Sequence, residues 1–107
     1  MAGSGVSVIA KRLREARERA ELSQKALGIA AGIDEFSASA RLNQYERGKH
    51  VPDILTIKNL ANVLGVPVAY FYTEDDDLAS MLITLSRVPK TKWDRLSKYL
   101  DRLASED

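Results

Sequence analysis

Apolar residues recur at helical spacing along most of the chain. In the first stretch they recur near helical spacing, at Val8, Ile9, Leu13, Ala16 and Ala20. Charged residues occupy the positions between them, Lys11 and Arg12 included. This spacing is typical of an amphipathic helix, so we predict a first helix that begins at Val8 and has these charged residues on its other faces.

Capping residues divide the next stretch into four shorter helices. Ser23 and Asp53 are good N-caps, and Gly32 and Gly65 are typical of helix ends. Asp34 or Ser37 can cap the third helix, so its start stays open at this point. The predicted helices cover residues 24–31, a third segment that ends at Gly48, residues 54–64, and a brief segment from Pro67 to Tyr72.

The rest of the chain is predicted to be helical as well. Residues 74–77 are Glu-Asp-Asp-Asp, an acidic stretch that is the best candidate for a boundary. Residues 78–88 and 91–104 have helical apolar spacing, with a break at Pro89. No strand pattern or repeat is recognisable, so the fold class is all-α. We predict a flexible arm (1–7), a five-helix unit (8–73), an acidic hinge (74–77) and a C-terminal helical pair (78–107).

The second predicted helix carries small residues at regular intervals. Gln24, Gly28 and Gly32 are four residues apart and therefore lie close to one helix face. Two helices that cross closely need a very small residue at the contact, and the turn between them needs a residue that tolerates positive φ. Gly28 and Gly32 meet these two needs, which predicts a helix-turn-helix.

In this region the sequence resembles the Cro/cI-like helix-turn-helix family of phage and bacterial repressors, that is, the lambda-repressor-like or XRE-type regulators. The resemblance covers about residues 8–72, and the order and spacing of its fragments make it specific. The matching fragments are Leu22-Ser23-Gln24, Leu27, Ala31-Gly32, Tyr45-Glu46-Arg47-Gly48-Lys49, Pro52, Leu60-Ala61 and Leu64-Gly65-Val66. The resemblance implies that residues 8–73 form a helix-turn-helix DNA-binding domain.

The resemblance also implies a buried ion pair between the first and third helices, here Arg17 with Glu46. We therefore expect a structural role for these two residues, as for Gly28, Gly32 and the buried face of the third helix. One departure from the family is clear. Thirteen residues separate Gly32 from Glu46, about four more than the resemblance implies. They extend either the third helix at its start or the turn before it.

The third helix has one apolar face and one polar face. Ala38, Leu42 and Tyr45 fall together on a helical wheel and are predicted to be buried. Asn and Gln can read adenine, Arg can read guanine, and small residues let a helix approach the base edges in the major groove. The predicted base contacts are Ser37, Ser39, Ala40, Arg41, Asn43 and Gln44.

A second group of polar residues lies at the ends of the second and third helices. Such residues commonly bind phosphates, which positions a protein on DNA without reading sequence. The predicted phosphate contacts are Ser23, Gln24, Lys25, Arg47, Lys49 and His50. Residues 70–72 are Tyr-Phe-Tyr; they could stack on bases, but we favour packing in the core and hinge.

Composition excludes several other classes. The 107 residues are 45% hydrophobic and 29% charged, as in an ordinary globular protein, and the net charge is +1. We recognise no bilayer-spanning run and no secretory signal, so we expect a cytoplasmic protein with no membrane partner. The chain has no cysteine and one histidine. With no Gly-rich phosphate loop or nucleophile–base signature either, we expect no enzyme, no metal and no cofactor.

The C-terminal helices offer material for oligomerisation. Two short amphipathic helices cannot stably bury their apolar faces on each other alone, so they pack on the first domain or on a second copy. The acidic stretch before them favours the second copy, and Trp93 is the expected anchor. The predicted interface consists of Leu78, Met81, Leu82, Leu85, Trp93, Leu96 and Leu100, with Tyr99 and Leu103 on the same apolar face as Trp93.

Together these observations predict a sequence-specific regulator of double-stranded DNA from a bacterium or phage. We expect a repressor that acts as a homodimer on a palindromic operator. One alternative is a DNA-binding antitoxin or a restriction-modification controller whose C-terminal helices bind a protein partner. Another is a protein-interaction module that kept the fold and lost DNA binding; an enzyme is the least favoured class.

Overall fold

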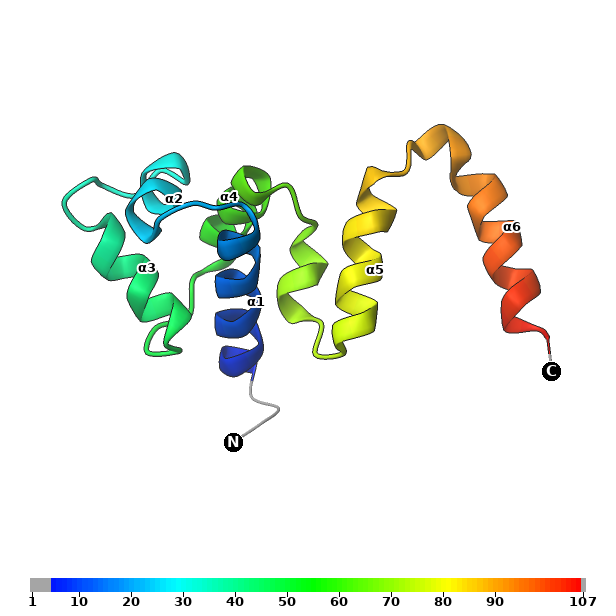
Figure 1. The fold of residues 1–107 in the computed structure, drawn as a ribbon, viewed down its shortest axis with the longest axis horizontal. Coiled ribbons are helices and arrows are strands. Elements are labelled where there is room, and N and C mark those ends of the chain that lie inside the picture. Colours follow the sequence, from blue (N-terminus) through cyan, green and yellow to red (C-terminus); the bar gives the residue numbers. More distant parts are fainter. Residues whose placement is uncertain (1–4, 107) are drawn as a thin grey trace.

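The computed structural model describes residues 5–106, which form helices joined by short turns (Figure 1). No strand occurs in this range. The first part of the chain and α5 pack together, and α6 projects away from them (Figure 1). In chain order the elements are α1 (Gly5–Arg19), α2 (Gln24–Ala30), α3 (Ala38–Glu46), α4 (Ile54–Leu64), the 3-10 helix η1 (Val68–Tyr72), α5 (Asp76–Arg87), the 3-10 helix η2 (Lys90–Lys92) and α6 (Trp93–Ala104).

One hydrophobic core holds the first five elements together. Each contributes a fully buried side chain: Leu13 from α1, Leu27 from α2, Leu42 from α3, Ile57 from α4 and Phe71 from η1. Burying a side chain of this size stabilises the fold by about 1.5–3 kcal/mol relative to leaving it in water. The apolar face of each helix therefore sets its orientation, and the predicted helical periodicity is confirmed.

The predicted caps of α2 and α4 are confirmed. The Ser23 hydroxyl accepts a hydrogen bond from the Ala26 N–H at 3.0 Å, and the Asp53 carboxylate accepts one from the Thr56 N–H at 2.8 Å. The bond from Thr56 lowers the pKa of Asp53. Gly65 ends α4 with a φ of 68°. α1 begins at Gly5, before the predicted start, so residues 5–7 of the expected arm are helical; residues 1–4 lie outside the described range.

α5 is part of the globular unit, which differs from the expected organisation. Ala79 and Ile83 of α5 are buried in the same core as η1 and α1. Asp75 caps α5 by accepting a hydrogen bond from the Leu78 N–H at 2.9 Å, and Asp76 and Asp77 lie in its first turn, where helix dipoles favour carboxylates. The acidic stretch 74–77 is therefore a fixed connection and not a hinge between separate units.

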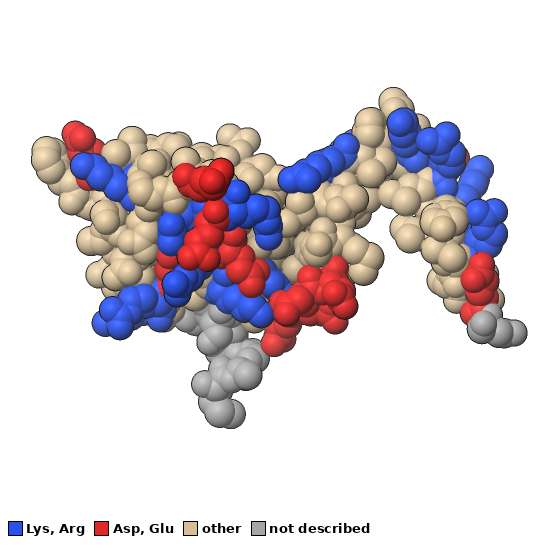
Figure 2. Space-filling view, viewed as in Figure 1, with Lys and Arg blue, Asp and Glu red and all other residues tan. Residues whose placement is uncertain are grey.

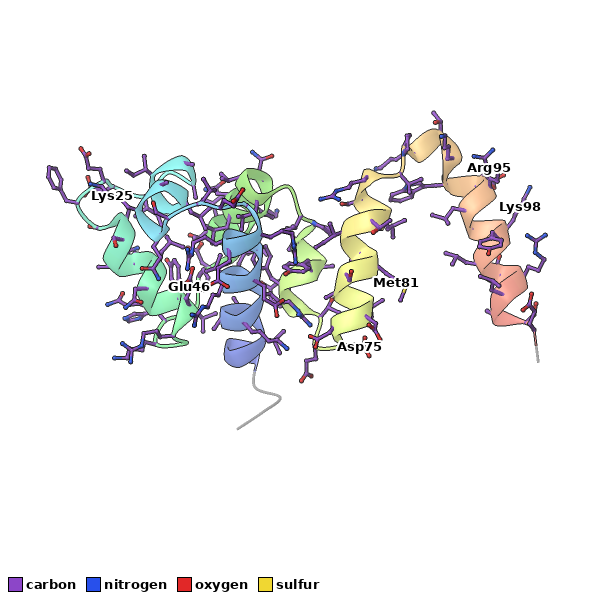
Figure 3. The ribbon with its side chains drawn as sticks, in the orientation of Figure 1. Lys25, Glu46, Asp75, Met81, Arg95 and Lys98 are labelled. Atoms are coloured by element: carbon purple, nitrogen blue, oxygen red, sulfur yellow. The ribbon has the colours of Figure 1, made fainter. Side chains whose placement is uncertain are left out.

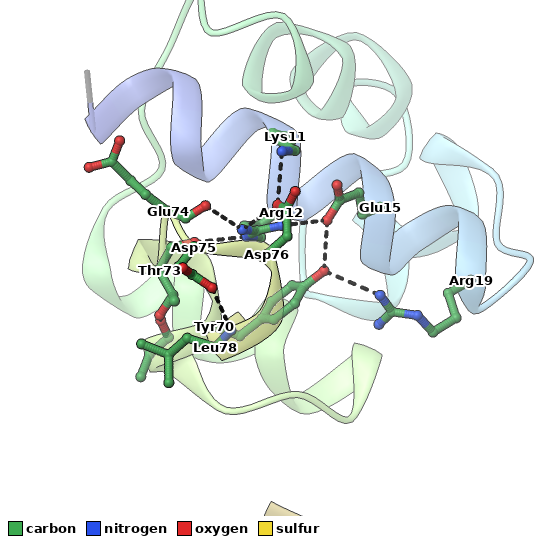
Figure 4. A network of polar contacts seen from close by, with 11 residues as sticks. Lys11, Arg12, Glu15, Arg19, Tyr70, Thr73, Glu74, Asp75, Asp76 and Leu78 are labelled. Atoms are coloured by element: carbon green, nitrogen blue, oxygen red, sulfur yellow. Dashed lines mark hydrogen bonds and ion pairs between the residues drawn. The ribbon is translucent and has the colours of Figure 1, made fainter. Parts of the chain in front are cut away.

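Arg12 anchors this connection to α1 (Figure 4). Its side chain is buried, although its position in the sequence predicts a polar face; the prediction for Arg12 is wrong because its partners lie far along the chain. Arg12 donates hydrogen bonds to the carbonyl oxygens of Thr73 and Glu74, both at 2.9 Å, and to Glu15 at 2.8 Å. The Asp76 carboxylate pairs with Lys11 at 3.0 Å and with Arg12 at 2.9 Å. The hydrogen bonds from Lys11 and Arg12 lower the pKa of Asp76, and the bond from Lys11 has the largest effect.

α6 packs little against the rest of the chain. None of its residues is buried, and its principal neighbour is η2. The corner between α5 and α6 is held by Trp93, whose indole N–H donates to the Val88 carbonyl oxygen at 2.9 Å. Within the described residues, no helix has the length and apolar character that crossing a membrane requires.

Candidate nucleic-acid interface

The crossing of α2 and α3 depends on Gly28. A Cβ atom at this position would lie 2.8 Å from the Ala38 Cβ and 3.0 Å from Leu42 Cδ2. These distances are too short for ordinary contact, so any larger residue would push α3 away. Gly32 follows in the turn with a φ of +92°, which glycine adopts without strain. Gly28 thus lies at the helix contact and Gly32 in the turn, the two places where the sequence pattern puts them.

A second contact, between Arg17 and Glu46, fixes α3 against α1. Arg17 Nε donates to Glu46 Oε2 at 2.5 Å and Nη2 donates to Oε1 at 3.0 Å, which makes the pair bidentate. The Glu46 side chain is 4% exposed and that of Arg17 is 15% exposed. Hydrogen bonding to Glu46 raises the pKa of Arg17. The ion pair implied by the family resemblance is present.

Gln24 extends this network toward the exposed side of α3. Its Nε2 donates to Glu46 Oε1 at 3.1 Å and, more weakly, to Asn43 Oδ1 at 3.4 Å. Both N–H donors of the amide are therefore occupied, whereas the sequence predicts that they bind phosphate. In this structure Gln24 instead positions Glu46 and Asn43.

The two faces of α3 differ as predicted. Ala38, Leu42 and Tyr45 are buried. Of the predicted base contacts, four are exposed and two are half-buried. The exposed ones are Ser39, Ala40, Arg41 and Asn43; the half-buried ones are Gln44 and, at the start of the helix, Ser37.

The turn between α2 and α3 contains the extra residues of this chain. α3 begins only at Ala38, and Ser37 stands at its N-cap without a side-chain capping bond. The Asp34 carboxylate accepts a hydrogen bond from the Phe36 N–H at 3.0 Å, and the Ser37 N–H donates to the Asp34 carbonyl at 3.0 Å. The extra residues therefore lengthen the turn and not the helix. Phe36 is 92% exposed there, a feature that the sequence analysis did not select.

Basic side chains lie near the C-terminal end of α3, and along α1 they alternate with acidic ones (Figure 2). Of the predicted phosphate contacts, Lys25, Arg47, Lys49 and His50 are exposed, and Ser23 is exposed while its hydroxyl caps α2. Arg14, which is not among the predicted contacts, lines the same shallow groove as Arg47 between α1 and α3. Its position on the exposed face of α1, one turn before Arg17, could have identified it in the sequence as a phosphate contact.

The aromatic residues 70–72 belong mostly to the core. Tyr70 and Phe71 are buried, with their rings edge to face at 5.7 Å, and Tyr72 is half exposed. The Tyr70 hydroxyl lies between Glu15 and Arg19, at 3.4 and 3.5 Å. The favoured prediction of core packing is confirmed for two of the three. Among residues 5–106, no three His, Cys, Asp or Glu side chains gather as metal ligands would.

Comparison with known proteins agrees with this geometry. The family profile described as a helix-turn-helix domain matches residues 8–70. The chain belongs to the helix-turn-helix domain family. The described structure is also similar to a solved structure titled "Crystal structure of transcriptional regulator BswR". The two are 44% identical with a TM-score of 0.81, over 92% of this chain and 98% of that chain. Comparison with curated proteins gave no match.

These findings confirm the predicted family and the all-α fold. They support a helix-turn-helix regulator that binds DNA, and they point to a non-enzymatic protein. In this helix-turn-helix protein the exposed face of α3, with the basic residues beside it, is the candidate surface for DNA.

Proposed function

We propose that this protein is a sequence-specific transcriptional regulator that binds double-stranded DNA as a homodimer and represses the gene it controls. The observation that carries the proposal is the fixed position of α3, which Gly28 and the Arg17–Glu46 pair hold against the domain. A helix held in this way presents the same side chains to every duplex. Such constancy is what reading a sequence in the major groove requires.

The exposed side of α3 suits base recognition. Ala40 and Ser39 are small and exposed, so the helix backbone can approach the base edges closely. Asn43 and Gln44 offer carboxamides that can bind adenine in a bidentate way, and Arg41 can bind guanine. Gln24 occupies only the oxygen of the Asn43 amide, which leaves the amide N–H groups of Asn43 for a base.

We infer a homodimer because the exposed face of one α3 helix is too short to read a whole operator. One helix-turn-helix reaches one half-site, and two-fold dimers read two half-sites about 34 Å apart, one turn of DNA. The exposed apolar residues of α5 and α6, Leu78, Met81, Leu100 and Leu103 among them, supply a surface for a second copy. The repressor role rests on the resemblance to Cro/cI-like repressors.

Replacing Gln44 with alanine is expected to weaken binding to the operator by about 1–3 kcal/mol and to relax the preference at one base position. Its carboxamide makes no hydrogen bond within the described residues, so the change should leave the fold intact. Affinities for the operator and for its single-base variants measure the effect. Asn59→Ala, which removes an exposed amide from α4, is the matched control. An equal loss on every sequence contradicts base reading by Gln44.

Replacing Lys49 with alanine is expected to weaken binding on all sequences alike. Loss of one phosphate contact should also lower the slope of log affinity against log salt by about one. Titrations at several salt concentrations give this slope, and Lys58→Ala on α4 provides the same loss of charge elsewhere. A slope that stays the same in Lys49→Ala, or falls as much in Lys58→Ala, rejects a phosphate contact at Lys49.

A second candidate function uses the same DNA surface with another partner for α6. An antitoxin or restriction-modification controller would present this exposed amphipathic helix to a different protein. The molar mass of the purified protein, free and on the operator, separates the two proposals. A dimer supports the homodimeric regulator, and a chain that stays monomeric in both states favours the second candidate.

A further inference from the structure

α6 is an amphipathic helix that its own chain leaves uncovered. Its apolar residues Tyr99, Leu100 and Leu103 are 50%, 52% and 44% exposed, and none of its residues is buried. Trp93, the expected anchor, also makes contacts within its own chain. Its indole N–H donates to the Val88 carbonyl oxygen, and the Lys90 ammonium lies 5.4 Å from the centre of its ring. The corner that aims α6 away from α5 is thus fixed by specific contacts.

α5 has two apolar faces, and only one of them is covered by its own domain. Ala79 and Ile83 pack into the core. The larger residues Leu78 and Met81 are 49% and 61% exposed, and Leu82 and Leu85 are half-buried. Figure 3 shows the Met81 side chain pointing into the space between α5 and α6.

The free faces of α5 and α6 lie on opposite sides of an open space. The two helices make almost no contact with each other, and the space-filling view shows the opening between them (Figure 2). An occupant of this space must be elongated and apolar along its length. A helix meets both requirements.

The charges disfavour an antiparallel pair of α6 helices and favour α5 as the partner. On a wheel, Arg95, Lys98 and Arg102 flank one side of the α6 apolar row, and Asp94 and Asp101 lie toward the other. Two α6 helices packed antiparallel about a two-fold axis would place like flanks together, which is unfavourable. α5 offers a better surface, because the acidic residues 74–77 lie at its start. Within residues 5–106, Arg95 and Arg102 form no ion pair, and neither do Glu74 and Asp77.

We propose that two copies of this chain exchange their C-terminal helices, so that α6 of each copy packs on the free face of α5 in the other. This inference rests on the homodimer of the proposed function and specifies its interface. Its apolar contact joins Leu96, Leu100 and Leu103 of one copy to Leu78, Met81 and Leu85 of the partner copy. Because Arg12 and the core fix α5 to the domain, the exchange sets the separation of the two α3 helices.

Cysteine cross-linking tests the exchange directly, since the chain has no cysteine of its own. Met81→Cys and Leu100→Cys are made in separate preparations with tags of different size, refolded together and oxidised so that neighbouring thiols form disulfides. The exchange predicts a covalent heterodimer that needs both variants. Ser80→Cys lies on the other side of α5 and should cross-link to Leu100→Cys at least about tenfold less, given the short reach of such bonds.

Three results overturn the exchange. A link between two Leu100→Cys chains alone would mean that α6 pairs with α6. A link within a single chain that carries both cysteines would mean that α6 folds back on its own α5. No link in any mixture, with a monomeric mass by light scattering, means that the two copies do not associate.

A second pair of variants tests the exchange by molar mass, without cross-linking. Leu96→Asp with Leu100→Asp should halve the molar mass while the globular part still unfolds cooperatively, because α6 has no buried residue in the monomer. Ser97→Asp adds a charge between these positions and should leave the dimer intact. A dimer that survives the double substitution overturns the exchange. None of these measurements uses DNA, so a failure of the proposed function, seen as absent duplex binding, is distinguishable from a failure of the exchange.

Discussion

Replacing Glu46 with alanine is expected to lower the free energy of unfolding by about 3–5 kcal/mol, the usual cost of breaking a buried ion pair. The Arg17 guanidinium would remain largely buried with only the Leu22 carbonyl oxygen, at 2.9 Å, as a partner. Gln24 would lose its acceptor on Glu46 as well. Urea unfolding, with the slope m held in common, measures the change.

Two controls separate the buried pair from charge in general. Glu18→Ala breaks the exposed pair with Arg14, at 3.4 Å, and should cost no more than about 1 kcal/mol. The double variant Arg17→Met with Glu46→Leu removes both buried charges and should be more stable than Glu46→Ala alone. Equal effects of Glu46→Ala and Glu18→Ala would contradict the structural role of the pair.

Replacing Gly28 with valine is expected to destabilise the fold by about 1–3 kcal/mol, as overpacking usually does. The new Cβ alone would lie 2.8 Å from the Ala38 Cβ, so α3 must move to make room. Because α3 carries the proposed base contacts, we expect operator affinity to fall even at temperatures where the variant is fully folded. Thermal unfolding and operator titration measure the two effects.

Ala26→Val is the matched control for Gly28→Val. It places the same β-branched residue on the exposed side of the same helix, where it meets no neighbour in the core. It should keep both the stability and the operator affinity near those of the parent. If Gly28→Val binds the operator as tightly as Ala26→Val does, the close crossing of α2 and α3 does not set the position of the reading helix.

Features that depend on neighbours along the chain could be predicted from the sequence. The buried face of α3 and the caps at Ser23 and Asp53 are local, since helical spacing or a contact three residues away determines each of them. Gly28 could be recognised because its spacing from Gly32 matches a known geometric need. The ion pair of Arg17 with Glu46 came from the family resemblance and not from spacing.

Features that depend on distant partners could not be predicted. Arg12 is buried because the carbonyl oxygens of residues 73 and 74 lie beside it, and nothing in the α1 pattern indicates them. α5 has two apolar faces, and the sequence pattern indicated only the one with the larger side chains of Leu78 and Met81. The smaller Ala79 and Ile83 fill the space that the core leaves. Asp34 and Ser37 are equally good caps in the sequence; in the structure Asp34 caps a turn and α3 begins at Ala38, which packs against Gly28.

Selection of bound duplexes from a random pool, followed by the mass of the complex, tests the central claim most directly. We predict enrichment of one two-fold symmetric sequence, two chains on each duplex, and an affinity that falls steeply as salt rises. A pool that stays random, with no salt-sensitive affinity for any duplex, would contradict the claim that α3 reads DNA.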